Sequence, residues 1–147
     1  MRHPPRLVPE LVCRDLERSL ACYVGILAFS IAYERPERRF AYLEREGAEL
    51  MLQEPVGRSF VNGELTYPYG RGINLQIEVS DIAVLLASVQ RAGLPLYLEL
   101  EDRWYRKDGA EVGNRQFVVA DPDGYLLRFF EDLGSRAAGI IKSDLEP

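Results

Sequence analysis

Histidine and cysteine are scarce in this sequence of 147 residues. The one histidine, His3, lies in a proline-rich N-terminal arm, where we expect it in solvent rather than in a functional site. The serines therefore have no histidine to act as their general base, and none lies in a nucleophile-elbow motif. The two cysteines, Cys13 and Cys22, fall in an apolar strand pattern and in a helical pattern. We expect both to be reduced, packed thiols.

Long apolar runs and an excess of basic residues are also missing. No apolar run approaches the roughly 20 residues that span a bilayer, and residues 1–6 lack the apolar core of a signal peptide. We therefore expect a cytoplasmic protein with no membrane partner. The net charge of −5 disfavours binding to nucleic acid and is compatible with a cationic ligand. Apolar residues, 47% of the chain, suffice for the core of a single domain over residues 1–147.

What the chain does contain is an internal repeat. The sequence at 40–52, Phe-Ala-Tyr-Leu-Glu-Arg-Glu-Gly-Ala-Glu-Leu-Met-Leu, recurs in outline at 117–129, and residues 11–16 are echoed by 77–82. Periodicity and turn residues predict the same order in each copy: strand, helix, strand and hairpin. The expected elements of the first copy are a strand at 7–14, a helix at 16–27 capped by Asp15, a strand at 29–35, and a hairpin of 40–45 with 49–53. Those of the second are a strand at 73–79, a helix at 82–92 capped by Asp81, a strand at 95–100, and a hairpin of 116–120 with 125–131.

The repeat predicts an α+β fold of two βαβββ modules that form curled mixed sheets around a cup. Module one spans about 7–54, a connector 55–71, module two about 72–133 and a tail 134–147. We expect the tail to be weakly ordered. Residues 101–114 are expected as a charged loop or a segment at the rim of the sheet.

These segments resemble the vicinal oxygen chelate superfamily, which includes glyoxalase I, extradiol dioxygenases, and the fosfomycin and bleomycin resistance proteins. The resemblance covers about residues 7–133 and depends on residues 12–19, 22–29, 47–52 and 121–129. Ala28 stands where the family usually has a glycine. The resemblance implies the glyoxalase/bleomycin resistance fold but no particular activity, because one fold hosts many functions.

The family's metal enzymes carry His, Glu or Gln ligands at positions that the resemblance maps onto Val8, Met51, Asn74 and Arg128. An isopropyl group, a thioether, an amide and a guanidinium do not make a site for a divalent metal. The resemblance therefore implies no metal and no cofactor, as in the bleomycin resistance branch. Proteins of that branch sequester the drug without altering it and are typically homodimers with ligand grooves at the interface. The sequences at 9–11 and 121–128 look similar to theirs.

Aromatic side chains among charged ones are the first candidate ligand contacts. Trp104 and Tyr105, with Glu101 and Asp102 beside them, would form a stacking wall for a flat or cationic ligand, or else a rim or dimer contact. Three aromatic residues of the connector would form the opposite wall or pack in a dimer: Phe60, Tyr67 and Tyr69.

Polar residues on the inward strand faces are the second set of candidates. Arg128 needs a partner if it is buried, and Glu10 is the natural one. Their pair would be structural or would anchor an anionic or polar ligand. Asn74 and Gln76, expected near Arg128, would orient a ligand or be satisfied core groups, and Met51 would contact a ligand or fill the core.

The sequence thus predicts a metal-free small-molecule binding protein that resembles bleomycin resistance proteins and sequesters an aromatic or cationic ligand. We expect binding rather than catalysis, and a homodimer. One alternative is a metal-dependent lyase, isomerase or dioxygenase with a displaced metal site. Another is a regulatory or interaction domain. The modules could pair within one chain or swap between two.

Overall fold

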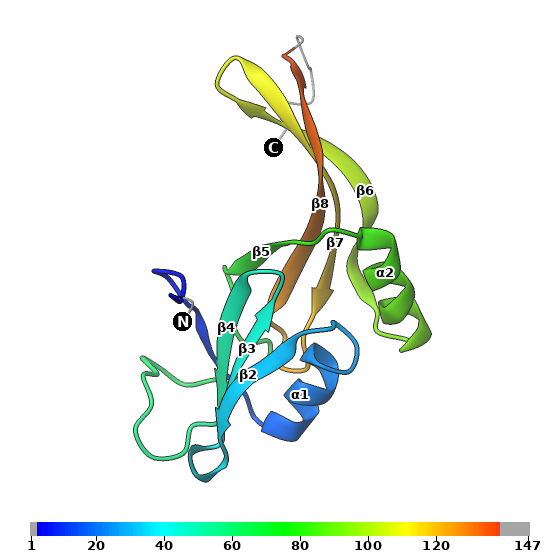
Figure 1. The fold of residues 1–147 in the computed structure, drawn as a ribbon. Helices are drawn as coiled ribbons and strands as arrows, with labels where there is room; N and C mark the ends of the chain where they lie inside the picture. The colour runs from blue at the N-terminus through cyan, green and yellow to red at the C-terminus, as the bar shows by residue number, and fades with distance from the viewer. Residues whose placement is uncertain (1–2, 139–147) are drawn as a thin grey trace.

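The computed structural model describes residues 3–138, which form two four-stranded sheets and two α-helices (Figure 1). The first module contains β1 (Glu10–Val12), α1 (Leu16–Tyr23), β2 (Ser30–Arg35), the 3-10 helix η1 (Pro36–Arg38), β3 (Phe40–Arg45) and β4 (Ala48–Gln53). The second contains β5 (Asn74–Glu78), α2 (Ile82–Arg91), β6 (Leu96–Lys107), β7 (Ala110–Ala120) and β8 (Leu126–Ala137). The predicted βαβββ order is confirmed in both modules.

The two sheets have equivalent topologies. Their strand orders are β1-β4-β3-β2 and β5-β8-β7-β6. In each, the first strand pairs in parallel with the last, and the other neighbours are antiparallel. The predicted mixed sheets are therefore confirmed. None of the helices in the described part of the chain is long and apolar enough to cross a membrane.

Both helices begin at the aspartates that the sequence indicates. The carboxylate of Asp15 accepts a hydrogen bond from the Arg18 amide, and that of Asp81 accepts one from the Val84 amide, each at 3.2 Å. Such caps satisfy amides that the first helical turn leaves free. Helix α1 is shorter than predicted and ends at Tyr23. Turns follow it over residues 24–27, and Ala28 then has a left-handed φ of 62°.

One face of each sheet packs against the helices and builds a core that runs through both modules. Leu43 and Leu52 from the first sheet and Phe117 and Phe129 from the second are fully buried in this core. Cys13 and Cys22 also lie in it as free thiols, and burial raises the pKa of each to about 12. The prediction of packed thiols is confirmed.

The other face of each sheet carries no helix. Because side chains alternate along a strand, Glu10, Phe40, Tyr42, Met51 and Gln53 share the helix-free face of the first sheet. The helix-free face of the second sheet has five corresponding residues: Asn74, Gln76, Gln116, Leu126 and Arg128. These two faces are the places where a ligand can meet a sheet.

Two segments are more regular than the sequence suggested. Residues 101–114, expected as a charged loop or a segment at the rim of the sheet, are mostly strand, because β6 runs to Lys107 and β7 starts at Ala110. Cross-strand pairs such as Asp102 with Arg115 compensate the charges of this hairpin. Strand β8 continues to Ala137, so the start of the expected weakly ordered tail is a strand, and residues 139–147 lie outside the described part. The ends of β6, β7 and β8 project from the rest of the protein as a three-stranded ribbon (Figure 1).

Candidate functional site

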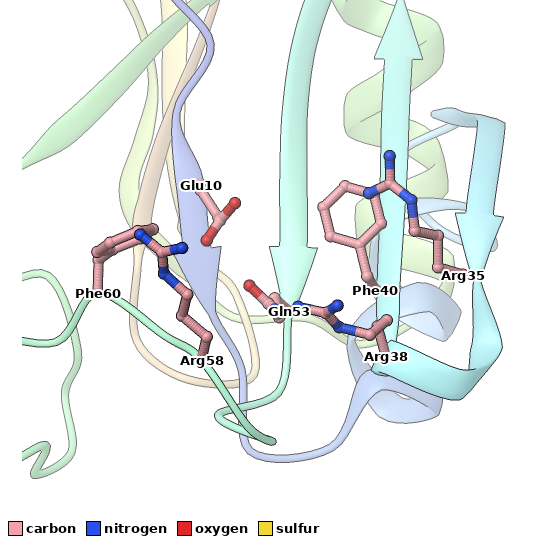
Figure 2. A pocket seen from close by; sticks show the side chains of 7 residues that line it. All are labelled: Glu10, Arg35, Arg38, Phe40, Gln53, Arg58 and Phe60. Carbon is pink, nitrogen blue, oxygen red and sulfur yellow. The ribbon is translucent and has the colours of Figure 1, made fainter.

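A pocket of about 390 Å³ lies on the helix-free face of the first sheet (Figure 2). We call it the first-sheet pocket. Its lining combines two aromatic rings with polar and charged groups: Glu10, Arg35, Arg38, Phe40, Gln53, Arg58 and Phe60. A volume of this size falls in the range of about 300–1,000 Å³ that small-molecule sites occupy.

Strand pairing places the floor of the pocket. Phe40 opens β3 and faces both Gln53 at the end of β4 and Arg35 at the end of β2. Gln53 in turn pairs with Val12 of β1, two residues after Glu10. The ends of four strands therefore bring a ring, an amide, a carboxylate and a guanidinium onto one surface.

The turn between β2 and β3 is held by an ion-pair cluster outside the pocket. Arg39, in a left-handed conformation with φ of 49°, binds both carboxylate oxygens of Glu17 and one of Glu54. Glu54 also accepts a hydrogen bond from the Leu16 amide at 2.8 Å. The cluster ties the end of β4 to the start of α1 and so fixes the backbone next to Arg38 and Gln53.

Two arginines of the pocket stack on aromatic rings. The guanidinium carbon of Arg35 lies 4.7 Å from the ring centre of Phe40 and 5.3 Å from that of Tyr33. That of Arg58 lies 5.1 Å from the ring of Phe60, a residue of the connector that is 80% exposed. The stacked arrangement gives each cation a preferred orientation.

The connector tyrosines lie elsewhere. Tyr67 and Tyr69 line a separate, mostly apolar pocket of about 370 Å³ with Tyr97 and Leu126. The guanidinium carbon of Arg14 lies 5.5 Å from the Tyr67 ring centre and 5.8 Å from that of Tyr69. Of the predicted aromatic contacts on the connector, Phe60 is thus the one that lines the first-sheet pocket.

The polar candidates divide between the two sheets. Glu10 lines the first-sheet pocket next to Met51, its partner in the sheet register. Asn74, Gln76 and Arg128 share the helix-free face of the second sheet, as predicted. The expected ion pair between Glu10 and Arg128 is not formed, since the two side chains belong to different sheets. The Nε atom of Arg128 is buried and has no hydrogen-bond partner within residues 3–138.

Trp104 and Tyr105 do not form one wall. As neighbours on β6 they point to opposite faces. The Tyr105 hydroxyl accepts a hydrogen bond from the Gln116 amide at 2.7 Å. Trp104 instead lies against Gly113, with the Arg136 guanidinium carbon 4.0 Å from its ring centre.

Asp102 is occupied by an arginine of its own sheet. The guanidinium of Arg115 donates to both carboxylate oxygens, at 2.8 and 3.0 Å, and these bonds hold the pKa of Asp102 below its ordinary value. The carboxylate that was expected to counter a cationic ligand therefore already has a partner.

The sequence reasoning missed Arg35, Arg38, Phe40, Gln53 and Arg58 as site residues. The short 3-10 helix η1 carries Arg38, whose side chain extends toward Gln53 (Figure 2). Pairing the predicted strand at 29–35 with the one at 40–45 would have placed Arg35 opposite Phe40, as the structure has them.

The positions onto which the sequence resemblance maps metal ligands do not suit a divalent metal. Met51 and Arg128 lie on the helix-free faces of different sheets, and a thioether and a guanidinium are unsuited to a divalent cation that prefers oxygen and nitrogen ligands. Among residues 3–138, the group of acidic side chains close enough to share an ion is Asp15, Glu17 and Glu54. Arg39 already binds two of them, and its hydrogen bonds lower the pKa of Glu17 to about 2.

Several solved structures have a fold similar to that of this chain. No protein-family model matches the sequence, and no curated protein matches it. TioX from Micromonospora sp. ML1 has a similar structure with a TM-score of 0.65, at 24% identity over 88% of this chain and 99% of that one. A glyoxalase/bleomycin resistance protein/dioxygenase from Alicyclobacillus acidocaldarius gives 0.57, at 24% identity over 90% and 96%.

A superfamily member from Vibrio splendidus 12B01 is 38% identical over 87% of this chain and 98% of that one, with a TM-score of 0.39. The likeness in fold rests on structures with TM-scores above 0.5, such as those of TioX and the Alicyclobacillus protein. These likenesses show that the chain has the fold of the glyoxalase/bleomycin resistance protein/dioxygenase superfamily, the fold that the sequence resemblance implied.

Proposed function

We propose that the protein binds a small aromatic molecule in the first-sheet pocket and holds it without a metal and without changing it chemically. The observation that carries this proposal is the pocket itself, in which the rings of Phe40 and Phe60 flank the carboxylate of Glu10 and the amide of Gln53. Rings supply apolar contact area, and a few fixed polar groups set the orientation of a ligand.

Binding rather than catalysis is supported by what lines the pocket. Glu10 is its one carboxylate, and its other charged side chains are arginines, which offer hydrogen-bond donors and no acceptor. General acid–base catalysis needs a group that gives a proton and a group that takes one. A single carboxylate among arginines favours a holding site.

Of the two ligand classes that the sequence suggested, the aromatic one fits this pocket better. Three arginines line it against one carboxylate, so a cation would be repelled. A bleomycin-like drug, the ligand that the resemblance suggests, would have to place its flat part beside Phe60 and keep any positive charge away from the three arginines.

We also propose that the protein works as a homodimer. Two buried polar atoms on the helix-free face of the second sheet, Nε of Arg128 and Oε1 of Gln116, have no hydrogen-bond partner within residues 3–138. Buried polar atoms in native proteins are rarely left unpaired. A second copy of the chain packed on this face would supply an acceptor toward which the half-buried Arg128 can turn, and light scattering of the purified protein should give twice the mass of the chain. A monomeric mass at every concentration would reject the dimer.

A titration followed by NMR tests the binding proposal. Bleomycin and small aromatic compounds are added to ¹⁵N-labelled protein, and the backbone amides are followed, because Trp104 lies outside the pocket and its fluorescence would not report on it. We expect saturable shifts around Glu10, Phe40, Gln53 and Phe60, with the mass of the recovered ligand unchanged. A converted ligand, or stoichiometric iron, zinc or manganese in the purified protein, would favour the enzyme alternative instead.

A further inference from the structure

Three arginines of the first-sheet pocket come from three different segments. Arg35 ends β2, Arg38 belongs to η1, and Arg58 follows β4 in the connector. Figure 2 shows Arg58 on the side of β1, Arg35 on the side of β2, and Arg38 between them. With Glu10 as the opposing carboxylate, the lining has an excess of two positive charges, although the whole chain has a net charge of −5.

Several arginines of the molecule have an acidic partner, which the three pocket arginines lack within the described part of the chain. Arg14 pairs with Asp123 at 2.7 Å, Arg115 with Asp102 at 2.8 Å and Arg136 with Glu111 at 3.2 Å. Within residues 3–138, neither Arg35, Arg38 nor Arg58 forms an ion pair. Acidic residues outnumber basic ones by 23 to 18, so partners are not scarce, and like charges gathered without one repel each other.

The stacking of two of these cations leaves their hydrogen-bond donors free. A guanidinium that lies over a ring uses its face for the ring and keeps the N–H groups at its edge for an acceptor. Arg35 over Phe40 and Arg58 over Phe60 are both arranged in this way. Planar donors of this kind match the two oxygens of a carboxylate or the oxygens of a sulfonate or phosphate.

We infer that the ligand of the first-sheet pocket is an aromatic molecule with an anionic group, and that Arg35, Arg38 and Arg58 recognise that group. The inference rests on the proposed ligand pocket and adds the charge of its ligand. The exposed ring of Phe60 contacts the aromatic part, and the buried ring of Phe40 lies beneath Arg35 and supports its guanidinium. Glu10 repels an anion bound in the wrong orientation.

Three naphthalene compounds of matched size test this inference: 2-naphthoate, neutral 2-naphthamide and cationic 2-naphthylmethylamine. Calorimetric titration should give an affinity for 2-naphthoate at least about tenfold above that for 2-naphthamide, since one charge-assisted hydrogen bond contributes about that factor. The amine should bind most weakly. The preference for 2-naphthoate should also shrink as salt is added, because the arginines are exposed.

Single substitutions test whether the preference for 2-naphthoate over 2-naphthamide arises in the first-sheet pocket. Arg35→Gln, Arg38→Gln and Arg58→Gln should each reduce the affinity for 2-naphthoate and leave that for 2-naphthamide nearly unchanged. Arg91→Gln is the matched control, because it removes an exposed positive charge on α2 that lines none of the described pockets. Arg38→Lys should restore part of the affinity, since it keeps the charge but loses the planar donor pair.

The outcomes separate the two proposals. Equal affinities for 2-naphthoate and 2-naphthamide, unaffected by the arginine variants, would overturn the anionic ligand and leave the aromatic pocket standing. If none of the three compounds binds to the wild-type protein, the proposed function fails together with the inference.

Discussion

Tyr23 of α1 donates its hydroxyl to the carboxylate of Asp121 at 2.8 Å, and this hydrogen bond joins the helix of the first module to the turn between β7 and β8 of the second. Tyr23 is fully buried and Asp121 is 4% exposed. Burial raises the pKa of Asp121, while the bond from Tyr23 acts in the opposite direction. Asp121 also accepts hydrogen bonds from the amides of Asp123 and Tyr125, so one carboxylate holds both its own turn and the neighbouring module.

Removing this hydroxyl should destabilise the protein. Tyr23→Phe leaves a buried carboxylate with one donor fewer, which costs about 1–3 kcal/mol in the free energy of unfolding. Urea denaturation measures the change. Tyr33→Phe is the control, because Tyr33 is partly exposed and its hydroxyl has no hydrogen bond within the described residues, so the change should stay within about 0.5 kcal/mol. Equal losses in the two variants would show that the bond to Asp121 does not stabilise the fold.

Arg39→Gln should make stability depend less on acid pH. The hydrogen bonds from Arg39 lower the pKa of Glu17 from 4.5 to about 2 and also lower that of Glu54. A carboxyl whose pKa is lowered by folding stabilises the protein above its unfolded pKa, and this contribution is lost as the pH falls through the folded value. The variant should therefore be less stable than the wild type at pH 7, and the difference should shrink between pH 4.5 and 2.

Urea denaturation of both proteins across this range provides the measurement. A difference between wild type and Arg39→Gln that stays constant from pH 7 to pH 2.5 would contradict the role assigned to the ion-pair cluster.

Gly113→Ala should disturb the packing of Trp104. A Cβ atom at position 113 would lie 2.8 Å from the Trp104 ring, closer than two carbon atoms can approach, so the ring must move. Overpacking of this kind costs about 1–3 kcal/mol, and Trp104 fluorescence should shift because its contact with Arg136 changes. Gly109→Ala is the matched control, since a Cβ atom there meets nothing within 4 Å. An unchanged emission spectrum in Gly113→Ala would contradict this packing.

Ala28→Gly should be neutral or stabilising. Ala28 is exposed and adopts a φ of 62°, a conformation that costs an L-residue roughly 1–2 kcal/mol and glycine much less. The gain is partly offset by the greater freedom of glycine in the unfolded chain, about 0.4–1 kcal/mol. Ala87→Gly, in the middle of α2, should instead destabilise by about 1 kcal/mol. Thermal melting of both variants gives the comparison, and a lower melting temperature for Ala28→Gly would be contrary to expectation.

The parts of the fold that local chemistry determines were predictable. Asp15 and Asp81 cap the helices where the sequence indicated, because a cap needs only its own side chain and the next few amides. The turn at 121–124 was equally clear, since its Asp-Pro-Asp-Gly sequence has few alternatives. Because the two halves of the sequence are similar, the order of strands and helix predicted for the first module could be transferred to the second.

The candidate site could not be predicted in the same way. Strand pairing and the short 3-10 helix bring Arg35 and Arg38 into the same pocket as Gln53. Arg58 and Phe60 lie on a connector whose sequence has no periodic pattern. Strand parity showed which residues of one sheet share a face, as for Gln76 and Arg128. Strand parity could not show that Glu10 and Arg128 belong to different sheets, so the predicted ion pair between them was wrong.

A backbone-amide NMR titration with 2-naphthoate tests the central claim most directly. The account predicts saturable shifts concentrated around Glu10, Phe40, Gln53 and Phe60, and much weaker ones in Arg38→Gln. Shifts concentrated around Tyr67, Tyr69 and Tyr97 or along the ribbon of β6 to β8, with the same affinity in Arg38→Gln, would contradict it.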